Sequence, residues 1–92
     1  MLYNLSSDNF THWRIDRLAR AMQRSVNKFW KKIRVLSGAF ANSHLISIED
    51  SVVIYKVVFG VKGQAESSVL YKINIEDIDN NLEPEKVVIE DE

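Results

Sequence analysis

The chain has 92 residues, of which 46% are hydrophobic and 27% charged, and its formal net charge at pH 7 is −1. This composition predicts one soluble domain spanning 1–92 and excludes a disordered chain. The absence of cysteine excludes disulfides, thiolate metal sites and cysteine nucleophiles. No apolar run reaches about 18 residues, and the N-terminus has no basic start followed by an apolar stretch. We therefore expect neither a membrane span nor a secretion signal, and we place the protein in the cytoplasm with no membrane partner.

The small net charge conceals a division along the chain. Residues 1–44 hold eight basic and two acidic side chains, a net charge of +6, whereas residues 45–92 hold four lysines and eleven acids, a net charge of −7. Such an asymmetry between two halves indicates an interaction surface or a charged tail. It is equally compatible with basic and acidic surfaces that simply balance each other.

The segment from about 8 to 37 is predicted to form one long amphipathic helix. Its large apolar residues recur at spacings of three and four, as one helix face requires: Ile15, Leu18, Met22, Val26, Phe29, Ile33 and Leu36. Basic side chains occupy the opposite side, namely Arg14, Arg17, Arg20, Arg24, Lys28 and Lys31. Asp8 suits the N-terminal end of this helix, and Gly38 suits its C-terminal end.

Strands are predicted where β-branched and aromatic residues dominate or alternate with polar ones, over 44–49, 51–61 and 67–76. Turns separate them at Asp50–Ser51 and at 62–65. Residues 77–92 are predicted to be an acidic linker and tail, in which 86–90 form either a fourth, edge strand or a frayed end. The expected fold is therefore α+β, with one long N-terminal amphipathic helix packed on an antiparallel meander of three to four strands.

The central strand, 51–61, has two apolar faces. One of them, which we expect under the helix, consists of Val53, Tyr55, Val57, Phe59 and Val61. The other, which includes a residue from the next strand, consists of Val52, Ile54, Val58 and Leu70. A single helix covers only one face of such a sheet, so this second set is a candidate for contact with a partner protein, a second copy or the chain's own ends. The sequence leaves open which face the helix takes.

No pattern in the chain predicts catalysis, a metal site or a cofactor. The glycines are isolated and form no phosphate-binding loop. His12 and His44 are far apart in the sequence, and we expect both to be structural or surface residues. Glu76, Asp77 and Asp79 together offer carboxylates to a metal ion, but acids at the end of a strand ordinarily mark a turn. We therefore expect a protein that is not an enzyme.

The leading hypothesis is a small non-enzymatic protein-binding module, of the inhibitor or adaptor type that phages, plasmids and immunity loci encode. Its partner would be another protein or a second copy in a homodimer, contacted through the split-charge surface and the apolar sheet face. The alternative is a nucleic-acid-binding protein that contacts phosphates with the basic face of the helix, where Trp13 and Trp30 serve as stacking elements. The sequence pI of about 6.1 disfavours this alternative. A solvated helix face, paired in part with the acidic half, accounts for the same charges without a function.

Overall fold

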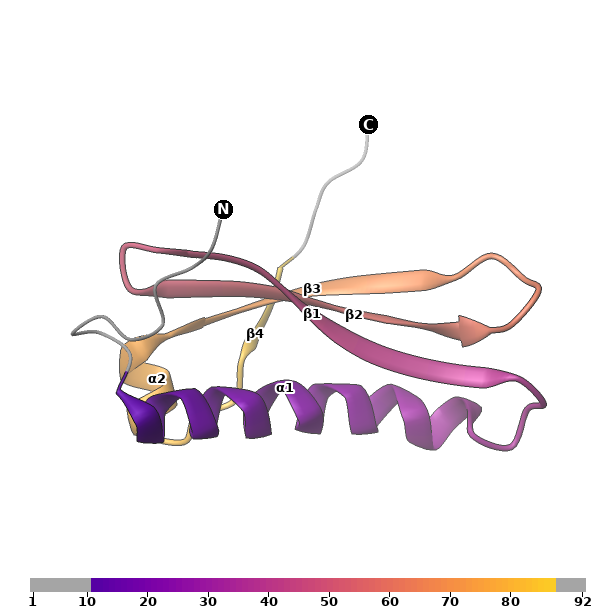
Figure 1. Ribbon diagram of the computed structural model, residues 1–92, viewed down its shortest axis with the longest axis horizontal. Coiled ribbons are helices and arrows are strands. Elements are labelled where there is room, and N and C mark those ends of the chain that lie inside the picture. The colour runs from indigo at the N-terminus through magenta and orange to yellow at the C-terminus, as the bar shows by residue number, and fades with distance from the viewer. Residues whose placement is uncertain (1–10, 88–92) are drawn as a thin grey trace.

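A long helix runs along one face of a four-stranded antiparallel sheet in the computed structural model (Figure 1). The structure describes residues 11–87. In chain order the elements are α1 (His12–Ile33), β1 (Ala39–Glu49), β2 (Val52–Val61), β3 (Ser67–Asn74), α2 (Ile75–Asp79) and β4 (Glu85–Val87). The predicted α+β fold, with an N-terminal helix packed on an antiparallel meander, is confirmed.

The strands lie in the order β1-β2-β3-β4, so each strand pairs with its neighbour in the sequence. A tight turn joins β1 to β2, and both of its residues have positive φ angles, 52° at Asp50 and 68° at Ser51. This is the combination that a type I′ turn requires, and its twist matches that of the flanking strands. An extra residue, Ile46, forms a bulge in β1 between Leu45 and Ser47.

The core lies between α1 and the face of the sheet that carries Val53, Tyr55 and Val57, none of which has exposed surface. The helix covers this face with the apolar stripe predicted from its spacing, in which Leu18 and Val26 are buried. Full burial of such a side chain contributes about 1.5–3 kcal/mol. The face expected to lie under the helix is therefore the one that α1 takes.

The C-terminal end of α1 differs from the prediction. The helix ends at Ile33, and residues 34–37 form turns instead of a further helical turn. Leu36, which the spacing placed in the apolar stripe, is consequently 49% exposed. Gly38 has a φ of 80°, a conformation that glycine adopts without steric cost, and the chain reverses there into β1. The start differs as well, because α1 begins at His12, not near 8, and Thr11 is extended at its N-cap; Asp8 itself lies outside the described residues.

The strand boundaries also differ. β1 begins at Ala39, not at 44, because residues 39–43 pair with β2 although they include no β-branched residue. β3 ends at Asn74, where a capping box with Asp77 starts α2. The segment predicted as an acidic linker from 77 is thus helical up to Asp79. β4 corresponds to the beginning of the predicted strand 86–90, and the rest of that segment lies outside the described residues.

Candidate functional site

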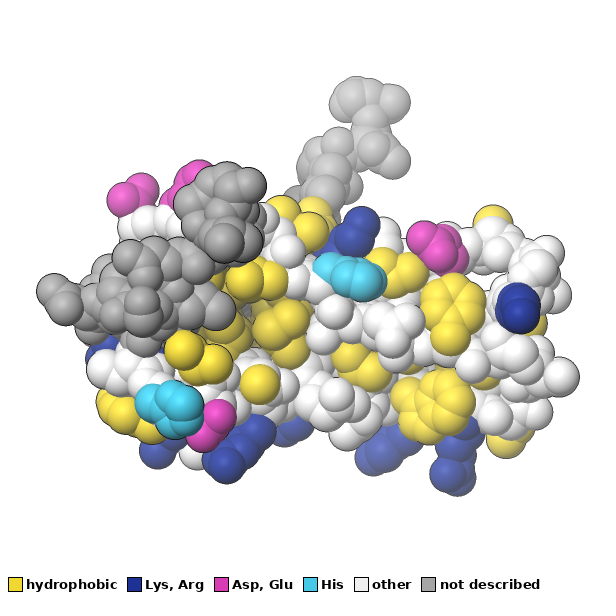
Figure 2. Space-filling model, viewed as in Figure 1, with side chains coloured by type: hydrophobic (Ala, Val, Ile, Leu, Met, Phe, Trp, Pro, Cys, Tyr) yellow, Lys and Arg dark blue, Asp and Glu magenta, His cyan; other side chains and the backbone are white. Residues whose placement is uncertain are grey.

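The predicted partner-binding residues of α1 do not form one uniform surface. Lys and Arg side chains line the lower edge of the molecule in Figure 2, along the side of α1 that faces away from the sheet. Four of the six predicted residues are exposed, and we call these the basic crest: Arg20, Arg24, Lys28 and Lys31. Arg14 and Arg17, near the start of the helix, are only partly exposed.

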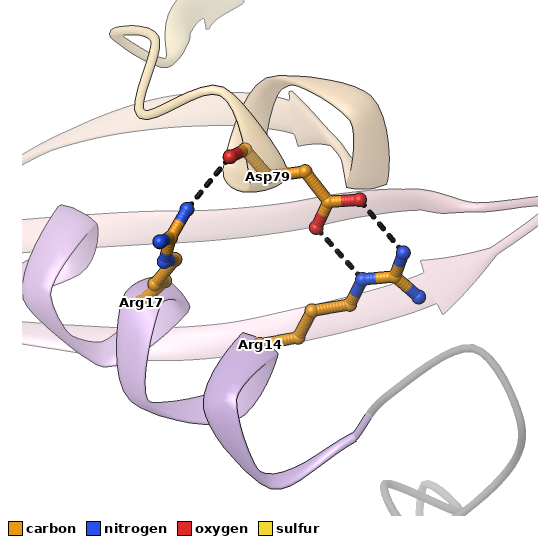
Figure 3. A network of polar contacts seen from close by, with 3 residues as sticks. All are labelled: Arg14, Arg17 and Asp79. Carbon is orange, nitrogen blue, oxygen red and sulfur yellow. Dashed lines mark hydrogen bonds and ion pairs between the residues drawn. The ribbon is translucent and has the colours of Figure 1, made fainter.

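Asp79, the last residue of α2, binds both of these arginines (Figure 3). Arg14 Nε donates to Asp79 Oδ1 and Arg14 Nη2 donates to Oδ2, each at 2.7 Å, which makes a bidentate ion pair. Arg17 Nη1 donates to the main-chain carbonyl oxygen of Asp79 at 2.6 Å. The two arginines therefore hold α2 against α1, and neither presents its guanidinium as a free contact for a partner.

The ion pair shifts the pKa of both of its members. The hydrogen bond from Arg14 lowers the pKa of the Asp79 carboxyl below its ordinary value, although partial desolvation opposes this shift. The hydrogen bond to Asp79 likewise raises the pKa of Arg14. Since Arg14 occupies both oxygens of this carboxylate, Asp79 is poorly placed to bind a metal ion with Glu76 and Asp77.

Trp13 packs beside the same network at the surface. It is 46% exposed, and the guanidinium carbons of Arg14 and Arg17 lie 5.2 Å and 5.1 Å from its ring centroid. These distances are typical of cation–π contacts. Trp30 lies beside the edge of the sheet, where it lines a groove with Phe40. The two tryptophans that we predicted as stacking elements thus lie in different environments.

The basic crest has one weak ionic contact within residues 11–87. Lys28 Nζ lies 3.7 Å from Glu83 Oε1, and the two side chains are 60% and 66% exposed. A pair as open to water as this contributes about 0–1 kcal/mol. Arg24, Lys31 and Glu83 line a shallow groove around it. The crest is therefore an exposed basic surface whose charge the acidic half compensates only in part.

The apolar candidates of the sheet lie on the face opposite α1, which we call the outer sheet face. The strand pairing places Val52, Ile54 and Val58 of β2 on this face, and Leu70 of β3 lies there opposite Lys56. Val52, Ile54 and Leu70 are partly exposed, whereas Val58 is only 7% exposed and can offer a partner little area. The structure therefore brings the predicted set together on one face but buries one member of it.

A shallow depression on the outer sheet face adds two apolar residues to this set. Ile46 and Val87 line it together with Leu70, and Lys56 and Lys86 lie beside them. Ile46, at the bulge, is 40% exposed. Sequence reasoning missed Ile46 because a bulge shifts the alternation of sides, and a bulge has no local pattern in this stretch.

The sequence prediction also missed a polar pair in the core. The hydroxyl oxygens of Ser25 and Tyr55 lie 2.7 Å apart, and the Ser25 hydroxyl donates to the carbonyl of Ala21 at 3.2 Å. Because Ser25 uses its one proton on Ala21, Tyr55 is the donor to Ser25. Burial raises the pKa of Tyr55 to about 12. The signal that could have revealed this pair is a serine at a stripe position where the helical spacing expects an apolar residue.

Three further features bear on the predictions made from the sequence. Within residues 11–87, no three side chains of His, Cys, Asp or Glu come together as ligands for a metal ion. His12 and His44 are both exposed. No helix of the described part of the chain is long and apolar enough to cross a membrane.

Comparison with known proteins gives no further guide to the site. No protein-family model matches the sequence, and no curated protein or solved structure matches it.

Proposed function

We propose that the protein is a small non-enzymatic binding module that docks on another protein through its outer sheet face. The observation that carries this proposal is the exposure of apolar side chains there: no helix within residues 11–87 lies over Ile54, Leu70 and Val87. Both helices of the described chain pack on the other side of the sheet. Contiguous apolar surface on a small domain is typical of a site for a protein partner.

The lysines around these residues define the chemistry of the partner. Lys56 pairs with Leu70 and Lys72 pairs with Ile54, so both lysines lie on this face. The contact of Lys72 with Glu85 is long, 3.9 Å, and exposed. We therefore expect a partner that presents apolar side chains within an acidic surface. The apolar centre would supply most of the affinity, and the charges would guide the encounter. A chain that covers the surface of a larger protein in this way acts as an inhibitor or an adaptor.

Affinity capture with three immobilised forms of the protein tests this proposal. These are the wild type, a sheet variant, Ile54→Lys/Leu70→Lys, and a crest variant, Arg24→Gln/Lys31→Gln. A protein that the wild type and the crest variant retain, and that the sheet variant loses, supports docking through the outer sheet face. Equal retention by all three forms overturns it. Both replaced sheet residues are partly exposed, so circular dichroism should show an unchanged fold.

The basic crest favours a second candidate, binding of nucleic-acid phosphates. Arg20, Arg24 and Lys31 make no ion pair with another described residue, and all three are exposed on α1. If the four crest cations displace counterions from duplex DNA, the logarithm of affinity should fall with the logarithm of salt concentration with a slope of about −3 to −4. The overall pI of about 6.1 makes this the weaker candidate.

Titration into labelled DNA and RNA, from low to physiological salt, decides on this candidate. The variant Arg20→Gln/Arg24→Gln/Lys31→Gln should lose binding, and Ile54→Lys/Leu70→Lys should retain it. Absence of binding by the wild type at low salt rules the candidate out.

A further inference from the structure

β1 lies at an edge of the sheet, and within residues 11–87 only β2 pairs with it (Figure 1). It has 11 residues, whereas β4 at the other edge has three. An edge strand carries backbone N–H and C=O groups with which a second chain can pair, and proteins usually guard such strands with lysine, proline or a bulge. From Ala39 to His44, β1 contains neither lysine nor proline, and its bulge lies beyond this stretch, at Ile46.

The hydrogen bonding between β1 and β2 identifies the residues whose backbone faces outward. Lys62 N–H donates to Gly38 C=O at 2.9 Å, immediately before the ladder begins. Hydrogen-bonded and non-hydrogen-bonded pairs alternate along antiparallel strands, so Asn42 directs its N–H and C=O groups to β2. Ala41 and Ser43 consequently direct theirs to the outer side of β1. The edge of β1 thus offers a second chain the backbone N–H and C=O groups of two residues, Ala41 and Ser43.

The flank of α1 beside this edge carries no charge at its centre. Gln23, Asn27 and Trp30 line a groove there with Phe40 and Ala41 of β1. Gln23 Nε2 donates to Asn27 Oδ1 at 3.0 Å, and Trp30 is 39% exposed. This side of the molecule, above the dark blue row in Figure 2, is largely hydrophobic and uncharged. A second copy of α1 can therefore approach this flank without bringing like charges together.

We infer that this edge joins two copies of the chain in a homodimer, in which β1 pairs antiparallel with β1 of the second copy about a two-fold axis at Asn42. In this register Ala41 of each copy lies opposite Ser43 of the other, and the backbones of these residues exchange hydrogen bonds across the axis. A two-fold interface uses the same patch on both copies, which this edge satisfies. The outer sheet face stays free, so the dimer does not depend on the proposed function.

The placement of α1 fits this arrangement. The helix packs on β1 and β2, near the dimer axis. Since neighbouring strands are about 4.8 Å apart, two helices centred between β1 and β2 of their own copies lie roughly 10 Å from each other, a distance at which helices pack. Trp30 and Gln23 of each copy then lie between the two helices, and the stretch of β1 from Ala39 to His44 becomes the centre of a continuous sheet.

Single cysteines test the interface directly, because the chain has none of its own. Asn42→Cys places a thiol on the two-fold axis, at a non-hydrogen-bonded pair with Cα atoms about 4.5 Å apart, within reach of a disulfide. Ser68→Cys, an exposed position on β3, is the matched control. Under mild oxidation Asn42→Cys should form a reducible dimer more than about tenfold faster than Ser68→Cys, because linkage within a dimer has an effective concentration on the order of mM. Equal rates overturn the inference.

Sedimentation equilibrium supplies the second measurement. The wild type should sediment at twice its monomer mass of 10.6 kDa. Gln23→Arg/Trp30→Arg, which brings four charges together between the helices, should sediment as a folded monomer, and Ser68→Arg should remain a dimer. A wild-type monomer at every soluble concentration overturns the inference. A dimer that only Ser68→Arg dissociates also overturns it, because the contact would then lie on the sheet face and not at the β1 edge.

Discussion

The hydroxyl group of Tyr55 lies in the centre of the core, and its hydrogen bond to Ser25 is what allows the whole side chain to be buried. Tyr55 has no exposed surface, and Ser25 is 2% exposed. A made hydrogen bond contributes about 0.5–1.5 kcal/mol, whereas a buried hydroxyl left without a partner costs about 1–3 kcal/mol. Removal of the Ser25 hydroxyl should therefore lower the free energy of unfolding more than removal of the Tyr55 hydroxyl.

We expect Ser25→Ala to lower the free energy of unfolding by about 1–3 kcal/mol, because the Tyr55 hydroxyl stays buried without an acceptor. Tyr55→Phe should lower it by about 0.5–1.5 kcal/mol, since Ser25 keeps its bond to the Ala21 carbonyl. The double variant should be less destabilised than the sum of the two. Urea unfolding of the four proteins gives this coupling. Strict additivity would mean that the two hydroxyls do not interact.

At Asp79, the ion pair makes stability depend on pH. The pKa of the folded carboxyl is lowered, so the unfolded chain takes up the proton at a higher pH than the folded one. The contribution of Asp79 is therefore complete above its unfolded pKa, about 4, and disappears as the pH falls through the lower, folded value. Asp79→Asn should reduce stability at pH 7 and should flatten the loss of stability below about pH 4.

Thermal unfolding of wild type and Asp79→Asn between about pH 2 and pH 7 checks this difference. Glu76→Gln is the matched control, because Glu76 is exposed in the same helix and makes no ion pair with another described residue. The control should keep the acid dependence of the wild type. A parallel pH profile for Asp79→Asn would show that Arg14 and Asp79 are not paired in solution.

Among the elements, α1 and the two inner strands were predictable because their patterns are long and regular. The helical spacing from Ile15 to Ile33 and the apolar run of β2 each extend over many residues, so local irregularities do not obscure them. The start of β1 was not predictable, since Ala39–Ser43 lacks β-branched residues and becomes a strand only by pairing with β2. α2 has five residues, and its burial of Ile75 and Ile78 depends on contacts with distant segments.

The turn between β1 and β2 carries a residue type that its backbone does not favour. Ser51 adopts a φ of 68°, in the left-handed region where a residue with a side chain is disfavoured by about 1–2 kcal/mol. The main-chain bond from Ile75 N–H to the Ser51 carbonyl, 3.0 Å, does not need the serine side chain. Ser51→Gly should therefore raise the free energy of unfolding by about 1 kcal/mol.

The comparison for this turn is Ser68→Gly, at the second residue of β3. Glycine is unfavourable within a strand, so this variant should lose about 0.5–1 kcal/mol. Thermal or urea unfolding of the two variants should thus shift in opposite directions. A loss of stability in Ser51→Gly would indicate that the serine side chain itself stabilises the turn.

Across the whole molecule, the charge division of the sequence is partly neutralised where the two halves meet. Arg14 contacts Asp79, and Lys28 lies near Glu83, so the acidic segment after β3 returns to the basic helix. The exposure of the crest followed from the helical period alone. The withdrawal of Arg14 and Arg17 from it required α2, an element that no local pattern revealed. The sequence therefore predicted that α1 has a basic surface, but it did not predict which of the basic residues remain exposed on that surface.

The segment after β3 also contributes buried residues of α2 to the core. We therefore predict that α2 unfolds together with the rest of the protein. Ile78 is 2% exposed, much like Leu18 in α1 at 5%, and both belong to one buried cluster. Ile78→Ala and Leu18→Ala should each lower the free energy of unfolding by about 2–5 kcal/mol, a large part of the 5–15 kcal/mol typical of a domain. Leu82→Ala, three residues beyond α2 and 51% exposed, should change the free energy of unfolding by less than about 0.5 kcal/mol.

Urea unfolding of these variants, followed by circular dichroism and by tryptophan fluorescence, checks this prediction. Coincident transitions displaced equally by the two buried variants are expected, whereas an unchanged midpoint for Ile78→Ala would mean that α2 opens independently of α1 and the sheet.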